Sequence, residues 1–452
     1  MTNQVRTPAV AGTFYPKQRE ELLLLIYAYL NKHAEKVTGQ PKALVVPHAG
    51  YVFSGNTAAA AYKQIMPFKE QCRRIIIVGA AHRTAVTGVV LPRAEYFSTP
   101  LGMVKLANEY IARIVKTGIA KFDDNAHQYE HSLEVQLPFI QTIFADIEIV
   151  PALMGDITIE QAVQFLHSVW GEADTLIIIS SDLSHYHNAA TAQLIDGNTE
   201  RKVALNDSSV GAEQACAALP LNALLYLAQI KNLRSTVIDY AHSGQNSGDN
   251  DRVVGYLAAV FSPNSEPDFQ FGAVMLRIAR AAICARWQEV PALLFPEISE
   301  LGELGATFVT LTKDGHLRGC IGALEAYRPL LDDLQKNAVA AAFGDPRFSP
   351  LAADELEHVC IEVSLLSKSE PLAFSNEAEL LQQLRPGIDG VIFRYRNKAS
   401  TFLPQVWEQL PTAELFMQQL KIKAGFSADF WQDEVAVSRY TVRKWKESDY
   451  GR

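Results

Sequence analysis

The stretch TLIIISSDLSH, residues 175–185, says most about the fold. Its uninterrupted β-branched and apolar run is typical of a strand that is buried on both faces of a parallel sheet. Similar runs recur, separated by helical patterns such as REELLLLIYAYLNK: ALVVP at 43–47, RIIIVG at 74–79, IEIVPAL at 147–153 and STVIDYA at 235–241. This alternation predicts an α/β domain with a mixed, largely parallel sheet.

The pattern changes after RVVGYLAAVF, where the Pro- and Ser-containing segment SPNSEPDF follows. We therefore predict a first domain over residues 1–261, a linker over 262–269 and a second domain over 270–452. In the second domain, ATFVTLTKDGHLRGCIGAL is typical of two strands that are joined by an Asp314-Gly315 turn. Further strands and hairpins with a few helices predict an α+β domain with antiparallel pairing.

Composition limits the classes of function. Of the 452 residues, 48% are hydrophobic and 20% are charged, which indicates globular protein throughout. The formal net charge of -9 gives no general attraction for nucleic acid or anionic lipid. It does not exclude a local basic face, so nucleic acid stays open as a partner of the second domain. No apolar run approaches the ~20 residues of a membrane span, so no membrane contact is expected. The N-terminus lacks a signal-peptide pattern, and the five cysteines include no CxxC pair, so we expect a cytoplasmic protein.

Histidines follow three of the predicted strands, namely His48, His82 and His185. Ligands of open α/β sheets bind beyond the carboxyl ends of the strands, and neutral imidazole is a common ligand of transition metals. A lone histidine after a strand more often bonds to backbone, but the repetition favours a shared metal pocket. His131 is a weaker candidate, because it is spaced to pair with Glu134 on one helix.

The strings TPAVAGTFYP, VVPHAGYVFSG, EHSLEVQLPF, SSDLSHYH and YAHSGQNSGD resemble the Memo family in order and spacing over residues 5–261. The Memo fold is similar to that of the class III, ring-opening, non-haem-iron dioxygenases. The resemblance implies a metal pocket with His48 and His82 as ligands and His185 in the place of the dioxygenase general base. Fe(II) is the expected metal, with Cu or Zn as alternatives.

The third ligand is less clear from the resemblance. Animal Memo proteins supply a cysteine and the dioxygenases a glutamate, whereas the local match here is Asn246, with Asp249 and Asp182 as substitutes. Because a neutral amide is a poorer Fe(II) ligand than carboxylate or thiolate, weak metal binding is expected. We expect Glu134 and Asp182 to lie behind the histidines and to orient their N–H groups.

In the second domain, LRGCIGAL places glycines at 319 and 322 beside Cys320. Glycine in a strand often marks a place where another molecule approaches the backbone, so we predict a substrate or partner cleft lined by Cys320 and Arg318. The loop GDPRFSPL adds Asp345 and Arg347 to this cleft. The alternatives are a buried structural cysteine and an internal Asp345–Arg347 ion pair.

HLRGCIGAL, AFGDPRFSPL, IEVSLL, DGVIF and TFLPQVWEQLP together resemble the AMMECR family over about residues 270–446. The core of that family is similar to folds that bind nucleotides or nucleic acid. Microbial genomes encode Memo and AMMECR proteins beside a radical S-adenosylmethionine protein, as the AmmeMemoRadiSam system. The resemblance thus implies this radical enzyme as a partner, and a substrate, small or macromolecular, that both fused domains serve.

Three functions follow as hypotheses. The first is a mononuclear Fe(II) oxidoreductase with His185 as acid or base. The second is a non-catalytic module that binds a peptide or small anion in an altered metal pocket. The third is a zinc hydrolase, because several histidines around one zinc ion can activate a water molecule.

Overall fold

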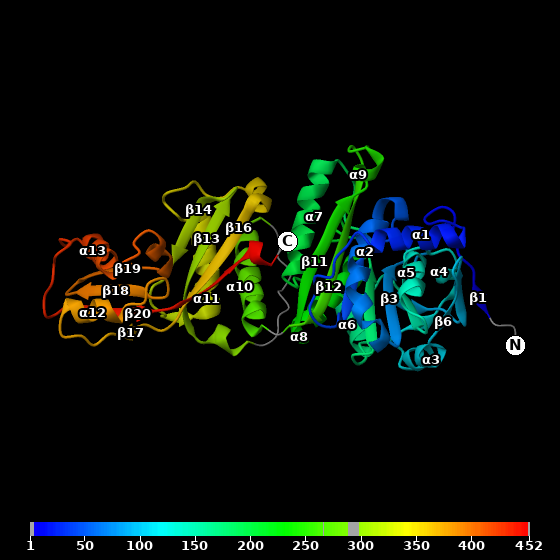
Figure 1. Ribbon diagram of the computed structural model, residues 1–452, viewed down its shortest axis with the longest axis horizontal. Coiled ribbons are helices and arrows are strands. Elements are labelled where there is room, and N and C mark those ends of the chain that lie inside the picture. Colours follow the sequence, from blue (N-terminus) through cyan, green and yellow to red (C-terminus); the bar gives the residue numbers. More distant parts are fainter. Residues whose placement is uncertain (1–3, 265, 288–297, 451–452) are drawn as a thin grey trace. The chain divides into compact units, whose positions relative to one another are not determined.

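The computed structural model describes residues 4–264, 266–287 and 298–450. These residues form two compact units, which are coloured blue to green and green to red in Figure 1. Residues up to Val274, with the last residues from Ser448, belong to the first unit, and most of the chain from Met275 to Glu447 belongs to the second. Among the described residues, none of the helices is both long and apolar enough to cross a membrane.

The centre of the first unit is a parallel sheet, which confirms the predicted α/β class. Neighbouring strands in the order β6-β8-β3-β9-β2 all run in the same direction. Their bounds are Gly102–Leu106 for β6, Glu148–Met154 for β8, Arg74–Ala80 for β3, Thr175–Ser180 for β9 and Ala43–Val46 for β2. Ile76, Ile77 and Ile178 are fully buried, and burial of each contributes about 1.5–3 kcal/mol.

Antiparallel strands extend this sheet at both edges. Strand β12 pairs antiparallel with β2 and β11, so β11 runs in the direction of the central strands. The added strands are β1 (Val5–Arg6), β4 (Val89–Leu91), β5 (Tyr96–Thr99), β7 (Lys121–Phe122), β10 (His185–His187), β11 (Leu233–His242) and β12 (Val253–Pro263). The carboxyl ends of β2, β3, β9 and β11 therefore meet at one edge of the sheet, which is where the histidines lie.

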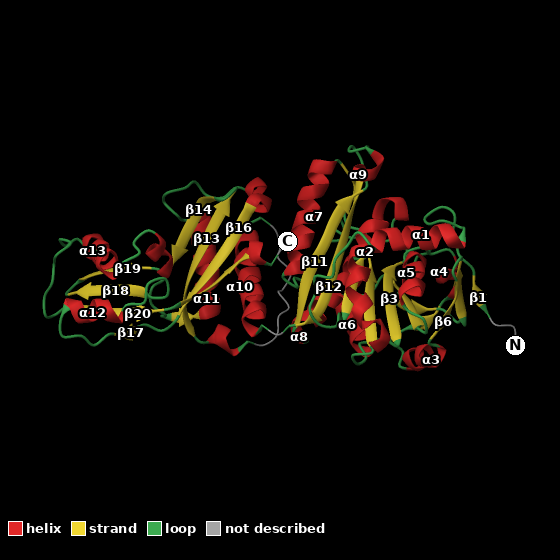
Figure 2. Cartoon of the chain, in the orientation of Figure 1, coloured by secondary structure: helices red, strands yellow, loops and turns green. Residues whose placement is uncertain are grey.

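Helices cover the sheet, as Figure 2 shows in red around the yellow strands. Helix α2 packs on β2, β11 and β12, and α8 packs on β3 and β9. The helices are α1 (Arg19–Leu30), α2 (Tyr51–Ile65), α3 (Asn108–Lys116), α4 (Asp124–Gln128), α5 (Leu137–Ile143), α6 (Ile159–Ser168), α7 (Ala189–Ala204), α8 (Ala218–Ile230) and α9 (Gly244–Ser247).

The second unit is α+β with antiparallel pairing, as predicted. One sheet contains β13 (Leu304–Lys313), β14 (His316–Gly322), β15 (Arg328–Pro329), β16 (Val359–Leu366) and β21 (Val442–Lys446). The other contains β17 (Glu370–Pro371), β18 (Gly390–Tyr395), β19 (Lys398–Phe402) and β20 (Ala436–Tyr440). The helices are α10 (Pro267–Cys284), α11 (Leu330–Phe343), α12 (Glu377–Gln383) and α13 (Ala413–Lys423).

The structure describes both the predicted hairpin turn and the segment that was expected to be a linker. Asp314 and Gly315 have φ angles of 50° and 78°, which is the left-handed pair that a two-residue hairpin turn needs. The segment 262–269, expected as a linker, contains the end of β12 and the beginning of α10. The boundary between the compact units falls inside α10, between Val274 and Met275.

Candidate metal centre

Three histidines gather at the carboxyl edge of the central sheet. His48 follows β2, His82 follows β3, and His131 lies in the loop before α5. The ring centroids are 5.0 Å apart for His48 and His82, 5.5 Å for His48 and His131, and 5.0 Å for His82 and His131. One ligand atom from each lies within 4.8 Å of the other two. Two nitrogens bound at about 2.1 Å to one ion are at most about 4.2 Å apart, so small side-chain rotations would suffice.

Cys216 adds a thiol to the three imidazoles. It lies just before α8, and its Sγ is 3.3 Å from Nε2 of His48. The backbone amide of Asp182 donates to the same sulfur at 3.3 Å, while the amide of Cys216 donates to the carbonyl of Asp182 at 3.2 Å. This pair of contacts fixes the cysteine to the end of β9. A thiol just before a helix N-terminus is also stabilised as the thiolate by the helix dipole.

The tautomer of His48 follows from its buried hydrogen bonds. The hydroxyl of Ser180 donates its one proton to the Ser132 carbonyl at 2.6 Å and accepts from Nε2 of Gln136 at 2.8 Å. Nδ1 of His48 lies 3.1 Å from that same hydroxyl oxygen. Since the hydroxyl has no second proton to give, Nδ1 carries the hydrogen and donates. Nε2 of His48 is therefore the nitrogen left to bind a metal, and it faces Cys216.

Glu130 performs the same task for His82. One of its oxygens lies 3.1 Å from Nδ1 of His82 and 3.2 Å from Nδ1 of His131, but only the contact with His82 has hydrogen-bond geometry. The same carboxylate accepts from the backbone amides of His82, His131 and Ser132. Because a carboxylate only accepts, it turns Nε2 of His82 away from itself and leaves that nitrogen available as a ligand.

The charges of the cluster depend on one another. Burial raises the pKa of the Cys216 thiol, but His48 and hydrogen bonds from His48 and His82 outweigh it and lower the pKa to about 5. Burial lowers the pKa of His48 and His82, whereas contacts with Cys216, and with Glu130 for His82, raise these values to about 9 and about 10. Contacts with His131 and His82 keep the pKa of Glu130 well below its usual range despite burial. Without metal, the cluster is thus a thiolate beside imidazolium groups.

This donor set fits a transition metal. Imidazole suits iron, zinc, copper and nickel, and thiolate adds a soft ligand that magnesium or calcium would not choose. His48 and the supporting Glu130 are each 2% exposed, whereas His82 is exposed and His131 is partly exposed, so the group has a buried base and one side open to solvent. An ion bound there would compensate the buried thiolate that otherwise rests on imidazolium partners.

Glu134, which we expected behind the histidines, contacts the N-terminal segment instead. Its oxygens accept from Arg6, from the amides of Ala9 and Val10 at 2.8 and 3.1 Å, and from the hydroxyl of Tyr15 at 2.5 Å. This carboxylate is saturated by the N-terminal segment and has no capacity left for an imidazole. The prediction for Glu134 was therefore wrong, and Glu130 orients the imidazole of His82 instead.

The other predicted site residues differ in position. Asp182 is buried, but its carboxylate accepts from the backbone amides of His48 and Ala49 at 2.7 and 3.3 Å and so holds the loop rather than an imidazole. Asn246 is exposed on α9, where its amide donates to the carbonyl of Phe53 at 3.2 Å. Cys216, and not Asn246, is the side chain in contact with His48.

His185 lies on the short strand β10 at the same edge. Its Nδ1 is 2.8 Å from the carbonyl of Leu183, and its ring packs against the ring of Tyr186 with centroids 5.6 Å apart. Tyr186 has a φ of 64°, and the pairing of β10 with β12 is irregular at this point. A non-glycine residue in this conformation is uncommon and marks a constrained backbone beside His185.

Strand-end reasoning missed Cys216, Glu130 and the ligand position of His131, because none of them follows a strand of the central sheet. Cys216 lies in QACAALP, just before the apolar helix AALPLNALLYL. A cysteine at the beginning of a helix is a recognisable signal for a thiolate, and it was available in the sequence.

Of the four residues predicted to line a cleft in the second unit, Cys320, Asp345 and Arg347 contact one another. Asp345 accepts from the amide of Cys320 at 2.8 Å and pairs with Arg347 at 2.7 Å, and Arg347 donates to the carbonyl of Cys320 at 3.2 Å. Arg318 instead pairs with Glu355 at 2.8 Å. A Cβ at Gly319 would come 2.1 Å from the carbonyl of Ala341 in α11. Close packing of the chain on itself accounts for this glycine.

Comparison with known proteins agrees with this architecture. The fold and the site define an α/β domain with histidine and cysteine side chains that could bind a metal, followed by an α+β domain. Residues 6–260 match the family model of the Memo-like proteins, and residues 276–445 match that of AMMECR1. The chain belongs to the Memo family and carries a fused AMMECR1 domain.

Similar proteins include MEMO1 family proteins from Aquifex aeolicus, 37% identical, and Thermoplasma acidophilum, 35% identical. The alignments cover 57% and 56% of this chain and 99% and 98% of those proteins. Among solved structures, the uncharacterized protein PH0010 from Pyrococcus horikoshii is 29% identical with a TM-score of 0.35, covering 39% of this chain and 91% of that one. The uncharacterized protein JW3007 from Escherichia coli is 15% identical with a TM-score of 0.34, covering 48% of this chain and 98% of that one.

Proposed function

We propose that the first unit is a mononuclear iron oxidoreductase. His48, His82 and Cys216 would hold Fe(II), with His131 as a fourth donor or as a neighbour that faces substrate. The observation that carries the proposal is that three imidazoles lie within reach of one ion, while the thiol of Cys216 is 3.3 Å from Nε2 of His48. When bound, the ion would supply the redox chemistry and the open coordination positions that oxygen-dependent reactions need.

His185 is the candidate acid or base. It lies at the same edge of the sheet as the three histidines, and it is partly exposed. The contact of its Nδ1 with the Leu183 carbonyl favours a hydrogen on Nδ1 and leaves Nε2 free to exchange a proton with substrate. The constrained backbone at Tyr186 would keep this ring in one orientation.

A zinc hydrolase is the second candidate, favoured by the presence of three histidines within reach of one ion. Three histidines and a water molecule form a known catalytic zinc arrangement. The thiol of Cys216 distinguishes the two candidates, because a fourth protein ligand would occupy the position that a zinc-bound water needs. The hypothesis of a non-catalytic binding module was motivated by the lack of a third ligand, and in this proposal Cys216 would be that ligand.

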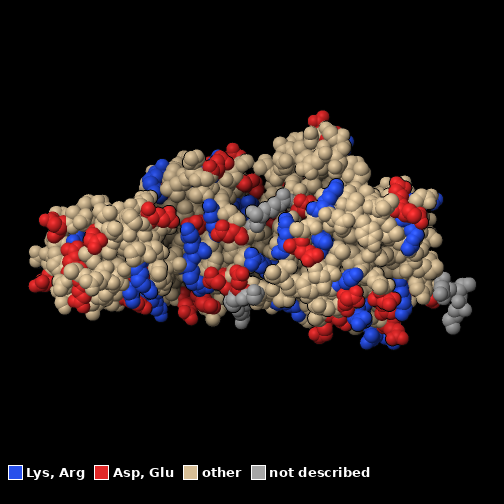
Figure 3. All heavy atoms as spheres, in the orientation of Figure 1, with Lys and Arg blue, Asp and Glu red and all other residues tan. Residues whose placement is uncertain are grey.

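We also propose a partner protein and a cellular compartment. The fusion of the two domains supports action on one substrate with the radical S-adenosylmethionine protein of the AmmeMemoRadiSam system. None of the five cysteines, all of which lie in the described residues, forms a disulfide, which suits the reducing cytoplasm. Basic and acidic side chains alternate over the face shown in Figure 3, which gives no support to nucleic acid as the partner there.

Metal analysis of the full chain after anaerobic purification tests the function, together with O₂ consumption on candidate aromatic substrates. Iron at one equivalent, with O₂ uptake that His185→Ala lowers while iron stays bound, supports the oxidoreductase. Zinc at one equivalent, with ester or phosphoester hydrolysis and without O₂ uptake, establishes the hydrolase instead. Full-length protein that binds neither metal contradicts both.

A further inference from the structure

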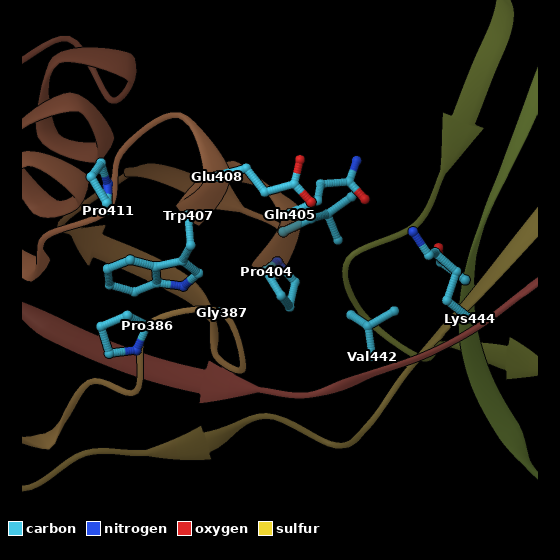
Figure 4. Close-up of a pocket in the computed structure, with 11 residues that line it drawn as sticks. Pro386, Gly387, Pro404, Gln405, Trp407, Glu408, Pro411, Val442 and Lys444 are labelled. Atoms are coloured by element: carbon cyan, nitrogen blue, oxygen red, sulfur yellow. The ribbon is translucent and has the colours of Figure 1, made fainter. Parts of the chain in front are cut away.

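The second unit contains a cavity of about 460 Å³ that is separate from the Cys320 region. It lies between β16 and β21 on one side and the segments 386–387 and 403–411 on the other, as Figure 4 shows. Ligand pockets usually measure about 300–1,000 Å³ and combine apolar walls with a few polar groups. The size of this cavity therefore suits a small molecule.

One wall is apolar and rigid. Pro386, Pro404 and Pro411 line it together with the indole of Trp407, as the close-up in Figure 4 shows. Trp407 donates from its ring nitrogen to the carbonyl of Asp389 at 2.7 Å and stacks on Phe416 with ring centroids 3.9 Å apart. Because prolines and a fixed indole lose little freedom on binding, this wall is preorganised for an apolar group.

The loop that carries Pro386 is fixed as well. Both oxygens of the buried Asp389 accept hydrogen bonds from Arg385, one from its backbone amide at 2.9 Å and one from its guanidinium at 2.6 Å. Gly387 in the same loop has a φ of 78°, a left-handed conformation that glycine adopts without strain. The cavity is thus built on both sides of the indole by backbone that is held in place.

The polar groups of the cavity are few and opposite in charge. Lys444 lies on one side, where its ammonium is half-exposed and its nearest carboxylate, that of Glu362, is 3.6 Å away. Glu408 and Gln405 lie on the other side and are exposed, and their side chains make no hydrogen bond or ion pair with any residue that the structure describes. The ammonium therefore keeps donors free for an anion, and the carboxylate can accept from a cation.

Ser364 adds a hydroxyl to the wall that carries Lys444. The residue is 4% exposed and lines the cavity. A hydroxyl can donate to a carboxylate oxygen or accept from a donor of the ligand. Ser364 is opposite Lys444 in the pairing of β16 with β21, so hydroxyl and ammonium present two donors side by side.

We propose that this cavity binds a zwitterionic, amino-acid- to dipeptide-sized molecule with an apolar side chain. Its carboxylate would accept from Lys444 and Ser364, its ammonium would donate to Glu408 and Gln405, and its side chain would lie against the prolines and Trp407. A ligand with only one charge would contact only one of the two charged sides of the cavity.

Isothermal titration of the full chain with three matched probes tests the proposal. The probes are phenylalanyl-alanine, its C-terminal amide, which keeps only the positive charge, and its N-acetyl form, which keeps only the negative charge. The zwitterion should bind about 10- to 100-fold more tightly than either analogue, as expected for loss of one charge-assisted hydrogen bond. Equal binding of the three probes, or no heat from any of them at millimolar concentration, overturns the proposal.

Variants then locate the binding. Lys444→Met should abolish the advantage of the dipeptide over its amide, and Glu408→Gln should abolish its advantage over the acetylated form. Lys444→Arg should restore most of the affinity, and Lys446→Met, one pleat further along β21, should leave it unchanged. Thermal melting of each variant verifies folding. Binding that survives both Lys444→Met and Glu408→Gln in folded protein places the ligand elsewhere and overturns the assignment.

Discussion

Cys216 and Cys320 both lie beside basic groups, and their surroundings differ. Cys216 is 3.3 Å from Nε2 of His48, which belongs to a group of three histidines with ligand atoms within reach of one ion. At Cys320, the neighbouring charges Asp345 and Arg347 satisfy each other and the cysteine backbone. Charged residues near a thiol therefore indicate a ligand-binding or reactive site only when their hydrogen-bonding capacity is left free for a ligand.

Among the variants that test this difference, His48→Ala should have the largest effect on metal affinity. Loss of second-shell groups alone usually costs 10–100-fold in metal affinity, so loss of this ligand should cost more than about 100-fold. Metal content after anaerobic loading, measured by elemental analysis, gives the result. His167→Ala, on the exposed face of α6, serves as the matched control. Retention of metal by His48→Ala would remove this residue from the site.

Glu134→Ala distinguishes a structural carboxylate from one that serves the site. The change leaves Arg6 buried without its ion-pair partner, and breaking such a pair costs about 3–5 kcal/mol of unfolding free energy. Chemical denaturation of the metal-free protein measures this cost. Glu148→Ala removes the solvent-exposed pair with Lys105 and should change the free energy of unfolding far less, because water screens such a pair. Equal costs for the two variants would contradict the account of Glu134.

Glu130→Gln should weaken metal binding by about 10–100-fold, because the carboxylate that accepts from Nδ1 of His82 is lost. A metal-competition titration with a coloured chelator measures the loss. Asp345→Asn, at the other cysteine, is the matched control and should leave metal affinity unchanged. An unchanged affinity for Glu130→Gln would show that the orientation of this ring does not depend on this carboxylate.

Metal affinity should also rise with pH between about 7 and 9. The pKa of Cys216 lies near 5, so its thiolate is present throughout this range, whereas the pKa values of His48 and His82 are raised to about 9 and about 10. Binding must displace the protons of these imidazoles, so affinity gains up to about tenfold per pH unit for each proton displaced. Titration in buffers of different ionisation enthalpy counts the protons, and binding without proton release in this range would contradict the assignment.

Most of the fold could be predicted from the sequence. The central strands are long β-branched runs bounded by polar residues, so β3 and β9 begin within one residue of the predicted runs. The Asp314-Gly315 turn was equally plain, because two left-handed residues in succession favour this pair. Local patterns sufficed where burial and backbone conformation decide the structure.

The site could be predicted only in part. His48 and His82 follow strands, and the topology of parallel sheets brings such residues to one edge. Cys216 and Glu130 reach the same point from loops whose course depends on tertiary packing, which no local pattern encodes. Similarly, Gly319 resembled a ligand-facing residue, but the contact that requires it comes from α11, more than a hairpin away in the chain.

Cobalt(II) titration of the full-length, metal-free protein under anaerobic conditions tests the central claim most directly, since a cobalt–thiolate bond gives an intense near-ultraviolet charge-transfer band. The account predicts this band at one equivalent of cobalt, its loss in Cys216→Ser and its retention in Cys320→Ser. A band that persists in Cys216→Ser, or wild-type protein that binds cobalt without one, would contradict the assignment of Cys216 as a metal ligand.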